Sequence, residues 1–209
     1  MSDSILQVEK IKPKDGSGTG AITIANSNSN VTIPSLAGGS IGSGVTGFTG
    51  IKVYDNWRLT ASLGTVSTTV YIKDNLERND TTGVGLIGSA MTVDSNGVWT
   101  FPMTGIYLLG FKAEFYKNVY ATYIGTTIDN IISGTLVNMS KGYTNLYYEG
   151  GDTGYTSSYQ EAFFDVVDTS THKVAFRYLE KGGTGDPLNL WGTTSYNATN
   201  FTFMRIGDT

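Results

Sequence analysis

Apolar and polar residues alternate with a period of two in many short segments after residue 52, and this period is typical of β-strands. The clearest alternation lies in residues 106–115. One face of this segment is apolar throughout: Tyr107, Leu109, Phe111, Ala113 and Phe115. The other face begins apolar and ends charged: Ile106, Leu108, Gly110, Lys112 and Glu114. We therefore predict a strand whose first face is buried and whose second face passes from covered to solvated along its length.

A shorter strand and a corner precede this segment. Residues 98–101 predict a strand that ends at Pro102, because proline cannot donate to a β-ladder. Gly105 supplies the backbone freedom that a tight corner needs. We expect the strands on either side of the corner to form the central strand pair of an all-β domain.

Similar patterns predict strands along the rest of the chain, at residues 52–61, 67–72, 120–128, 131–139, 158–167, 172–179 and 201–206. Two of these have matching apolar faces: Ala162, Phe164 and Val166 in one, and Val174, Phe176 and Tyr178 in the other. The turn residues between them predict a β-hairpin. No apolar repeat at helical spacing is sustained, so about eight to ten strands of a jelly-roll β-sandwich are expected.

The first 51 residues differ from the rest. Residues 1–36 hold three short alternating segments, 5–12, 21–24 and 31–33, separated by turns rich in Gly, Ser and Asn. Such a β-rich segment with few aromatic residues buries little surface alone, so we expect it to pair with copies of itself as a stem or virion-attachment segment. Residues 37–51 are rich in Gly and Ser and predict a flexible linker. Residues 52–209 are then the head domain.

Charge and cysteine content exclude several classes of function. A formal net charge of −4 disfavours binding to nucleic acid or to an anionic membrane. The chain has no cysteine, so disulfides, iron–sulfur clusters and thiolate zinc sites are excluded. No apolar run approaches the roughly 20 residues that span a bilayer. Residues 1–6 lack a basic segment followed by an apolar one, so we expect no signal peptide and synthesis in a host cytoplasm.

Residues 97–111 resemble the signature of the globular C1q heads, which belong with tumour necrosis factor to a group of trimeric jelly rolls. The matching residues are Gly97, Trp99, Phe101, Pro102, Gly105, Tyr107 and Phe111. The sequence departs from that signature at Leu109, where the family usually has an aromatic residue. The resemblance implies a homotrimer whose heads have both termini at the base. Some members bind calcium near the threefold axis, but no residue here maps onto such a site.

Candidates for chemistry are few. His172 is the only histidine. It is expected in a turn between two strands, and a position at the surface is a plainer interpretation of it than a role as catalytic base. The carboxylates are scattered, and no spacing favours one glycosidase-type pair over the others. No calcium-loop spacing is present. We therefore predict no catalytic residue, no metal and no cofactor.

The strongest candidate for recognition is a tyrosine-rich stretch, residues 141–159, whose composition suits adaptable recognition loops. The candidate surface residues, with a tryptophan from a later loop, are Tyr143, Tyr147, Tyr148, Tyr155, Tyr159 and Trp191. Two plainer interpretations stay open for the tyrosines, a pair of strand edges or a trimer contact. Trp191 is either an exposed platform or a plug for the end of the sandwich.

Residues 56–61, 165–174 and 201–209 resemble stretches in bacteriophage fibre proteins that carry C1q-like heads. This resemblance implies a homotrimeric virion protein, either a tail fibre or a capsid fibre. The N-terminal segment would contact other virion proteins, and the head would bind host polysaccharide or a receptor multivalently. Two alternatives stay open: a capsid decoration or adaptor protein without a ligand, and a carbohydrate-active enzyme.

Overall fold

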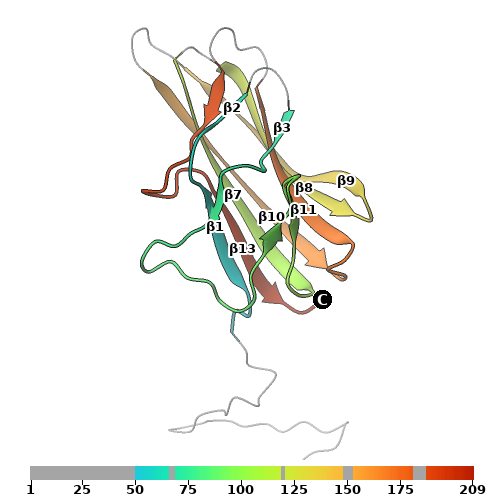
Figure 1. Ribbon diagram of the computed structural model, residues 1–209. Coiled ribbons are helices and arrows are strands. Elements are labelled where there is room, and N and C mark those ends of the chain that lie inside the picture. The colour runs from blue at the N-terminus through green and yellow to red at the C-terminus, as the bar shows by residue number, and fades with distance from the viewer. Residues whose placement is uncertain (1–49, 66–68, 119–120, 148–152, 181–186) are drawn as a thin grey trace, which may run out of the picture. The chain divides into compact units, whose positions relative to one another are not determined.

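The computed structural model describes residues 50–65, 69–118, 121–147, 153–180 and 187–209. All regular structure in these residues is β, in two antiparallel sheets that pack face to face (Figure 1). The described part of the chain contains no helix that is long and apolar enough to cross a membrane. The predicted stem and nearly all of the predicted linker lie outside the described residues, so the domain boundaries stay predictions.

Sheet A has seven strands. Its order is β2-β12-β7-β13-β1-β4, and β10 also pairs with β7. The long strand β7 is therefore central, with β10 along one edge and with β13 and β12 in succession along the other. The strands are β1 (Tyr54–Leu59), β2 (Leu63–Thr65), β4 (Leu76–Arg78), β7 (Gly105–Lys117), β10 (Gly154–Val166), β12 (Leu188–Leu190) and β13 (Asn200–Gly207).

Sheet B has six strands in the order β5-β6-β11-β8-β9, and β3 also pairs with β11. They are β3 (Thr69–Tyr71), β5 (Thr92–Val93), β6 (Val98–Thr100), β8 (Ala121–Ile132), β9 (Thr135–Leu146) and β11 (His172–Glu180). A two-residue turn with positive φ at Ser133 and Gly134 joins β8 to β9. The predicted strand break between residues 128 and 131 is therefore wrong, because β8 continues to Ile132.

Two predicted strand pairs are also wrong. The strands on either side of the Pro102 corner do not pair, because β6 belongs to sheet B and β7 to sheet A. The predicted hairpin around residues 167–172 likewise joins β10 of sheet A to β11 of sheet B. In both cases the two strands direct their apolar faces into one core from opposite sides. Alternation shows which face is apolar, but it does not distinguish pairing within a sheet from packing across the sandwich.

The predicted apolar face of β7 is confirmed, since all five of its residues are fully buried. The four aromatic residues of the signature stretch are buried with them: Trp99, Phe101, Tyr107 and Phe111. Trp99 joins the two sheets, with its ring centroid 4.9 Å from that of Phe203 and 6.1 Å from that of Phe176. The signature stretch therefore forms the centre of the core.

Two glycines of this stretch are required by their surroundings. Gly97 has φ +80°, and a Cβ there would lie 2.5 Å from the carbonyl oxygen of Ile72. Gly105 has φ +142°, and a Cβ there would lie 2.6 Å from the carbonyl oxygen of Gly207. Glycine is the residue that adopts such φ values without strain, so both corners depend on it.

The first and last described segments lie side by side at one end of the sandwich. The backbone N–H of Arg205 donates to the carbonyl oxygen of Val53 at 2.9 Å, and Lys52 Nζ lies 4.0 Å from Asp208 Oδ1. Figure 1 shows the C-terminus at this end, next to the entry to β1. This agrees with the arrangement that the C1q resemblance implies.

Candidate interaction faces

The side of sheet A that points away from the core is called face A here. It is formed by the outward residues of the paired strands β7 and β10, with neighbours on β13 and β1: Tyr54, Ile106, Leu108, Gly110, Lys112, Glu114, Tyr116, Tyr155, Ser157, Tyr159, Glu161, Phe163, Asp165 and Met204. These residues alternate with the buried ones in the register of the strands. Face A changes in character along the strands, and its three parts are described in turn.

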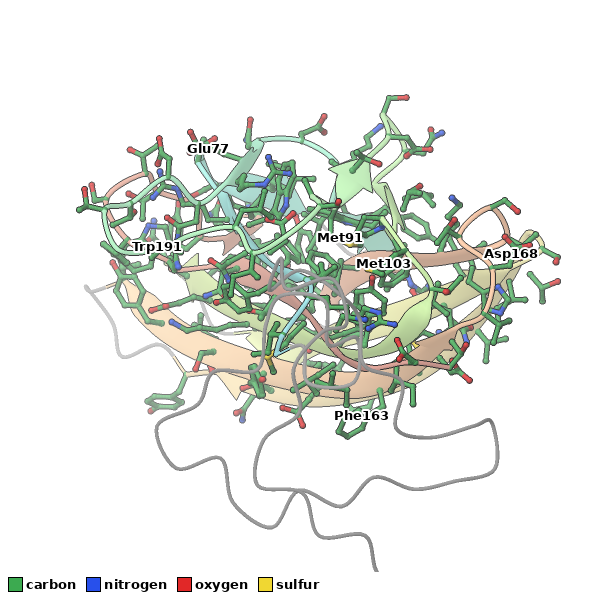
Figure 2. All side chains as sticks on the ribbon, turned by 90° about the horizontal axis from the view of Figure 1, so that it is seen from below. Glu77, Met91, Met103, Phe163, Asp168 and Trp191 are labelled. Carbon is green, nitrogen blue, oxygen red and sulfur yellow. The ribbon has the colours of Figure 1, made fainter. Side chains whose placement is uncertain are left out.

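The first part of face A is apolar. Phe163 of β10 pairs in register with Leu108 of β7, which pairs on its other side with Met204 of β13. The Phe163 side chain is 65% exposed, and Figure 2 shows it projecting away from the strands. A row of large apolar side chains thus crosses three adjacent strands, with Phe163 exposed and Leu108 and Met204 half-buried in the single chain.

The middle of face A has one tyrosine over a glycine. A Cβ on Gly110 would lie 3.2 Å from the hydroxyl oxygen of Tyr159, so the absence of a side chain at position 110 makes room for that ring. The Tyr159 hydroxyl donates to Glu161 Oε2 at 3.2 Å. Partial burial of the phenol, and then this bond to a carboxylate, raise the pKa of Tyr159. Beside it, Lys112 Nζ lies 3.3 Å from Glu114 Oε2.

The third part of face A is an aromatic cluster. Trp191, which follows β12, has its ring centroid 5.2 Å from that of Tyr155, 6.0 Å from that of Tyr116 and 5.8 Å from that of Tyr196. Tyr155 and Tyr196 are each about half exposed. Trp191 is therefore neither an isolated platform nor a plug inside the sandwich, because it joins tyrosines from three other segments at the surface.

The structure separates the six predicted recognition residues. Tyr155, Tyr159 and Trp191 lie on face A, and Tyr143 lies in β9 of the other sheet. Tyr147 is exposed directly after β9, whereas Tyr148 lies outside the described residues. The expectation of tyrosines in loops is corrected by this placement, because Tyr143, Tyr155 and Tyr159 stand on strands. No single site among the described residues contains all of them.

Two members of the aromatic cluster were missed by the sequence interpretation. Tyr116 continues the alternation of Lys112 and Glu114 by one more position, so extending the β7 pattern would have placed it on the same face. Tyr196 lies between β12 and β13 and has no periodic signal. Only the folded chain brings it to Trp191.

The inner faces of β9 and β10 explain the polar residues of the tyrosine-rich stretch. The side chains of Thr126 and Ser158 are hydrogen-bonded at 2.7 Å, and those of Thr144 and Thr156 at 3.0 Å. Ser140 donates to Gln160 Oε1 at 3.0 Å. These bonds join the edge of sheet B to the edge of sheet A and close this side of the sandwich. The tyrosine-rich stretch therefore lies on a pair of strand edges, which is one of the two plainer interpretations of its sequence.

The outward side of sheet B, called face B here, is more polar. The carboxylate of Asp129 is fully buried there and accepts from the Arg177 guanidinium, with Nη2 at 2.9 Å from Oδ1, and from Asn138. The hydrogen bond to Asp129 raises the pKa of Arg177. Arg177 also lies over the ring of Tyr71, with Cζ 5.6 Å from the ring centroid. Face B thus has a buried ion pair and the exposed rings of Tyr71 and Tyr143, whereas face A combines apolar and aromatic side chains with exposed charges.

The described residues give little support for catalysis. His172 is half-buried, its Nδ1 is 3.0 Å from Thr171 Oγ1, and its ring lies against that of Phe164. In the ranges that the structure describes, no group of three or more His, Asp or Glu side chains is placed to hold a metal ion.

The described part of the chain is therefore an all-β jelly roll of the tumour-necrosis-factor type. No protein-family model matches the sequence, and no curated protein matches it. Among solved structures, murine APRIL at pH 5.0 is similar with a TM-score of 0.50 and 14% identity, over 74% of this chain and 98% of that chain. The Eiger TNF of S. frugiperda has a TM-score of 0.46 and 11% identity, over 77% of this chain and 96% of that one. At such identities the likeness is one of fold.

Proposed function

We propose that the chain is a non-enzymatic, homotrimeric virion structural protein of a bacteriophage, a tail fibre or a capsid fibre. Its head would be displayed outward and would bind the host surface multivalently. The observation that carries this proposal is face A, where Tyr155, Tyr159 and Phe163 of β10 are exposed beside half-buried apolar and aromatic side chains of β7. Soluble monomers rarely expose contiguous apolar patches of more than a few hundred Å².

Self-association is the interpretation of face A that its chemistry favours. The face contains aromatic residues at one end and aliphatic residues with Phe163 at the other, and its charges are Lys112 and Glu114 between them and the exposed carboxylates Glu161 and Asp165 on either side of Phe163. An interface core rich in aromatic and apolar side chains, with few charges, is typical of homo-oligomers. Closed cyclic symmetry covers such a face in every copy. The number three comes from the resemblance of residues 97–111 to the C1q signature.

The virion setting rests on sequence. Residues 56–61, 165–174 and 201–209 resemble stretches in bacteriophage fibre proteins, and the segment before the head would attach it to other virion proteins. With face A covered by neighbouring copies, face B would stay open to a host ligand. Three weak sites in one trimer, repeated on one particle, raise avidity by orders of magnitude over a single site.

Adsorption to candidate host cells tests this proposal. The full chain fused to a fluorescent protein is expected to bind saturably, and a monomeric variant of the same fusion is expected to bind at least about 100-fold more weakly. Absence of adsorption by a stable trimer would favour the capsid decoration or adaptor role. Release of reducing ends from host polysaccharide would instead support a carbohydrate-active enzyme, and we expect none.

A further inference from the structure

A cavity of about 480 Å³ opens on face B, and it is called the cup here. Its volume falls in the range of small-ligand sites, roughly 300–1,000 Å³. Residues from β3, β6, β8 and two adjoining segments line it: Thr69, Tyr71, Lys73, Asn96, Val98 and Ile131. None of these residues belongs to face A, so a ligand in the cup and a neighbouring copy on face A would not compete for the same side chains.

The strand register explains why these side chains meet. Phe176 of β11 points into the core, so Ala175 and Arg177 on either side of it point outward. Val98 is opposite Ala175, and Tyr71 is opposite Arg177. The short strands β3 and β6 therefore occupy one edge of β11 in succession, with the cup where they meet.

The rim of the cup is held by hydrogen bonds before any ligand arrives. The carboxylate of Asp94 accepts from the backbone N–H groups of Asn96 and Val98, both at 2.9 Å. Gly97 packs against the backbone of Ile72 too closely for any Cβ. This fixed turn places Asn96 beside Lys73, and a site that is already ordered loses little conformational entropy on binding.

The side chains that line the cup suit a ligand with a polar ring and an apolar substituent. Tyr71 is 38% exposed, and the guanidinium of Arg177 over its ring fixes its orientation. Val98 and Ile131 contribute aliphatic surface, while Asn96 and Lys73 are exposed at the rim with an amide and an ammonium group. An aromatic face packs on the C–H side of a pyranose, and rim donors bind its hydroxyl groups.

We propose that the cup binds a sugar residue that carries an N-acetyl group. The ring would lie on Tyr71, the acetyl methyl would contact Val98 and Ile131, and Asn96 and Lys73 would bind the oxygen atoms at the rim. Each of these contacts is weak, as expected for one site of a multivalent head. The inference supplies a ligand class for the function proposed above, but it does not depend on the number of copies in the assembly.

Saturation-transfer NMR on the full chain tests the cup. The probes are the methyl glycosides of N-acetylglucosamine, N-acetylgalactosamine and N-acetylmannosamine, each compared with the parent hexose. For at least one pair, the acetyl methyl signal should be saturated strongly, and the acetylated sugar should bind about fivefold more tightly than its parent, since burying a methyl group stabilises by about 1 kcal/mol.

Two tyrosine variants locate the signal. Tyr71→Ala should abolish the saturation transfer, whereas Tyr143→Ala should preserve it. The control is closely matched, because Tyr143 is also exposed on sheet B and also lies under a cation, with Lys141 Nζ 5.2 Å from its ring centroid. The Ile131→Trp substitution, which fills the cup, should abolish binding without removing an aromatic residue.

The proposal is overturned if none of the three acetylated glycosides gives acetyl saturation at millimolar concentration, or if Tyr71→Ala leaves the signal unchanged. Circular dichroism of each variant establishes that the fold is retained. A trimer that binds host cells but none of these sugars would refute the cup and leave the proposed function intact. Binding of an acetylated sugar by a chain that stays monomeric would support the cup and refute the proposed homotrimer.

Discussion

Face A and face B are built on the two sheets of one sandwich, yet their side chains differ in kind. On face A, Phe163 and Tyr159 are more than 60% exposed, and the ion pair between Lys112 and Glu114 is itself open to solvent. A buried cation, Arg58, lies on β1, where it pairs with Glu77 and Asp80. On face B the carboxylate of Asp129 is fully buried and paired with Arg177. Face B has satisfied its polar groups within the chain, whereas face A leaves apolar surface that the chain does not cover. This difference is the reason for proposing that face A, and not face B, meets another copy.

The largest expected effect is on association. Phe163→Asp places a carboxylate in the middle of the apolar part of face A, where burial of an unpaired charge against another copy is strongly unfavourable. We expect the assembly to dissociate to monomers at micromolar concentration, as measured by light scattering. Val137→Asp is the matched control, because Val137 is an apolar strand residue of sheet B that is 54% exposed. If Val137→Asp dissociates the assembly and Phe163→Asp does not, the copies do not associate through the apolar part of face A.

The ion pairs of the two faces should differ in their effect on folding. Asp129→Ala removes one partner of a buried pair on face B and should lower the free energy of unfolding by about 2–4 kcal/mol. Glu114→Ala removes one partner of a solvent-exposed pair on face A and should lower it by no more than about 1 kcal/mol. Urea denaturation of both variants in the Phe163→Asp background measures folding without dissociation. Equal losses would contradict the distinction.

Gly97 at the rim of the cup gives a smaller and more local test. Gly97→Ala combines a positive φ with a contact to the Ile72 carbonyl oxygen, so we expect a loss of about 2–3 kcal/mol. Gly134→Ala has φ +81° with open space around it, and should lose only about 1 kcal/mol. Thermal denaturation compares the two. The difference in the loss of unfolding free energy between the two variants measures how tightly Gly97 is packed against Ile72. Equal losses would contradict tight packing at this rim.

The smallest effect is a pH dependence of the same rim. The hydrogen bond from the Val98 backbone, with others from Asn96 and Gly97, lowers the pKa of Asp94 below its usual 3.8. The charged carboxylate therefore adds stability that is fully present above about pH 4 and is lost as the pH falls through the lowered pKa. Asp94→Asn should be less stable than the natural chain at pH 7, and the two should converge near pH 2 in urea denaturation. A difference that does not depend on pH would contradict this assignment.

Much of the head could be predicted from the alternation of apolar residues. The buried face of β7 follows from that pattern, and the jelly roll follows from the number of strands and the signature of residues 97–111. Strand pairing could not be predicted, because β6 and β7 share a corner as hairpin strands do, yet they lie in different sheets. The short strands β2, β4, β5 and β12 were missed, since two or three residues carry no period.

The candidate site was predictable only in part. The unusual content of tyrosine pointed to residues 141–159, but alternation along β9 and β10 directs those side chains to both sides of the sandwich. The aromatic cluster depends on Tyr196 and Tyr116, which only tertiary structure brings to Trp191. The cup depends on β3 and β6 meeting along β11, so no local pattern could indicate it. Residues 97–111 thus identify the domain and contribute only in part to the proposed surfaces, through Val98 in the cup and Ile106 and Leu108 on face A.

The most direct test of the account is the mass of the full chain in solution, since the central claim is that face A is covered by other copies of this chain. Sedimentation equilibrium from micromolar to nanomolar concentration should give three times the chain mass of 22.4 kDa, and Phe163→Asp should give the mass of one chain. A stable 22.4 kDa species for the natural chain over the whole range would contradict the claim.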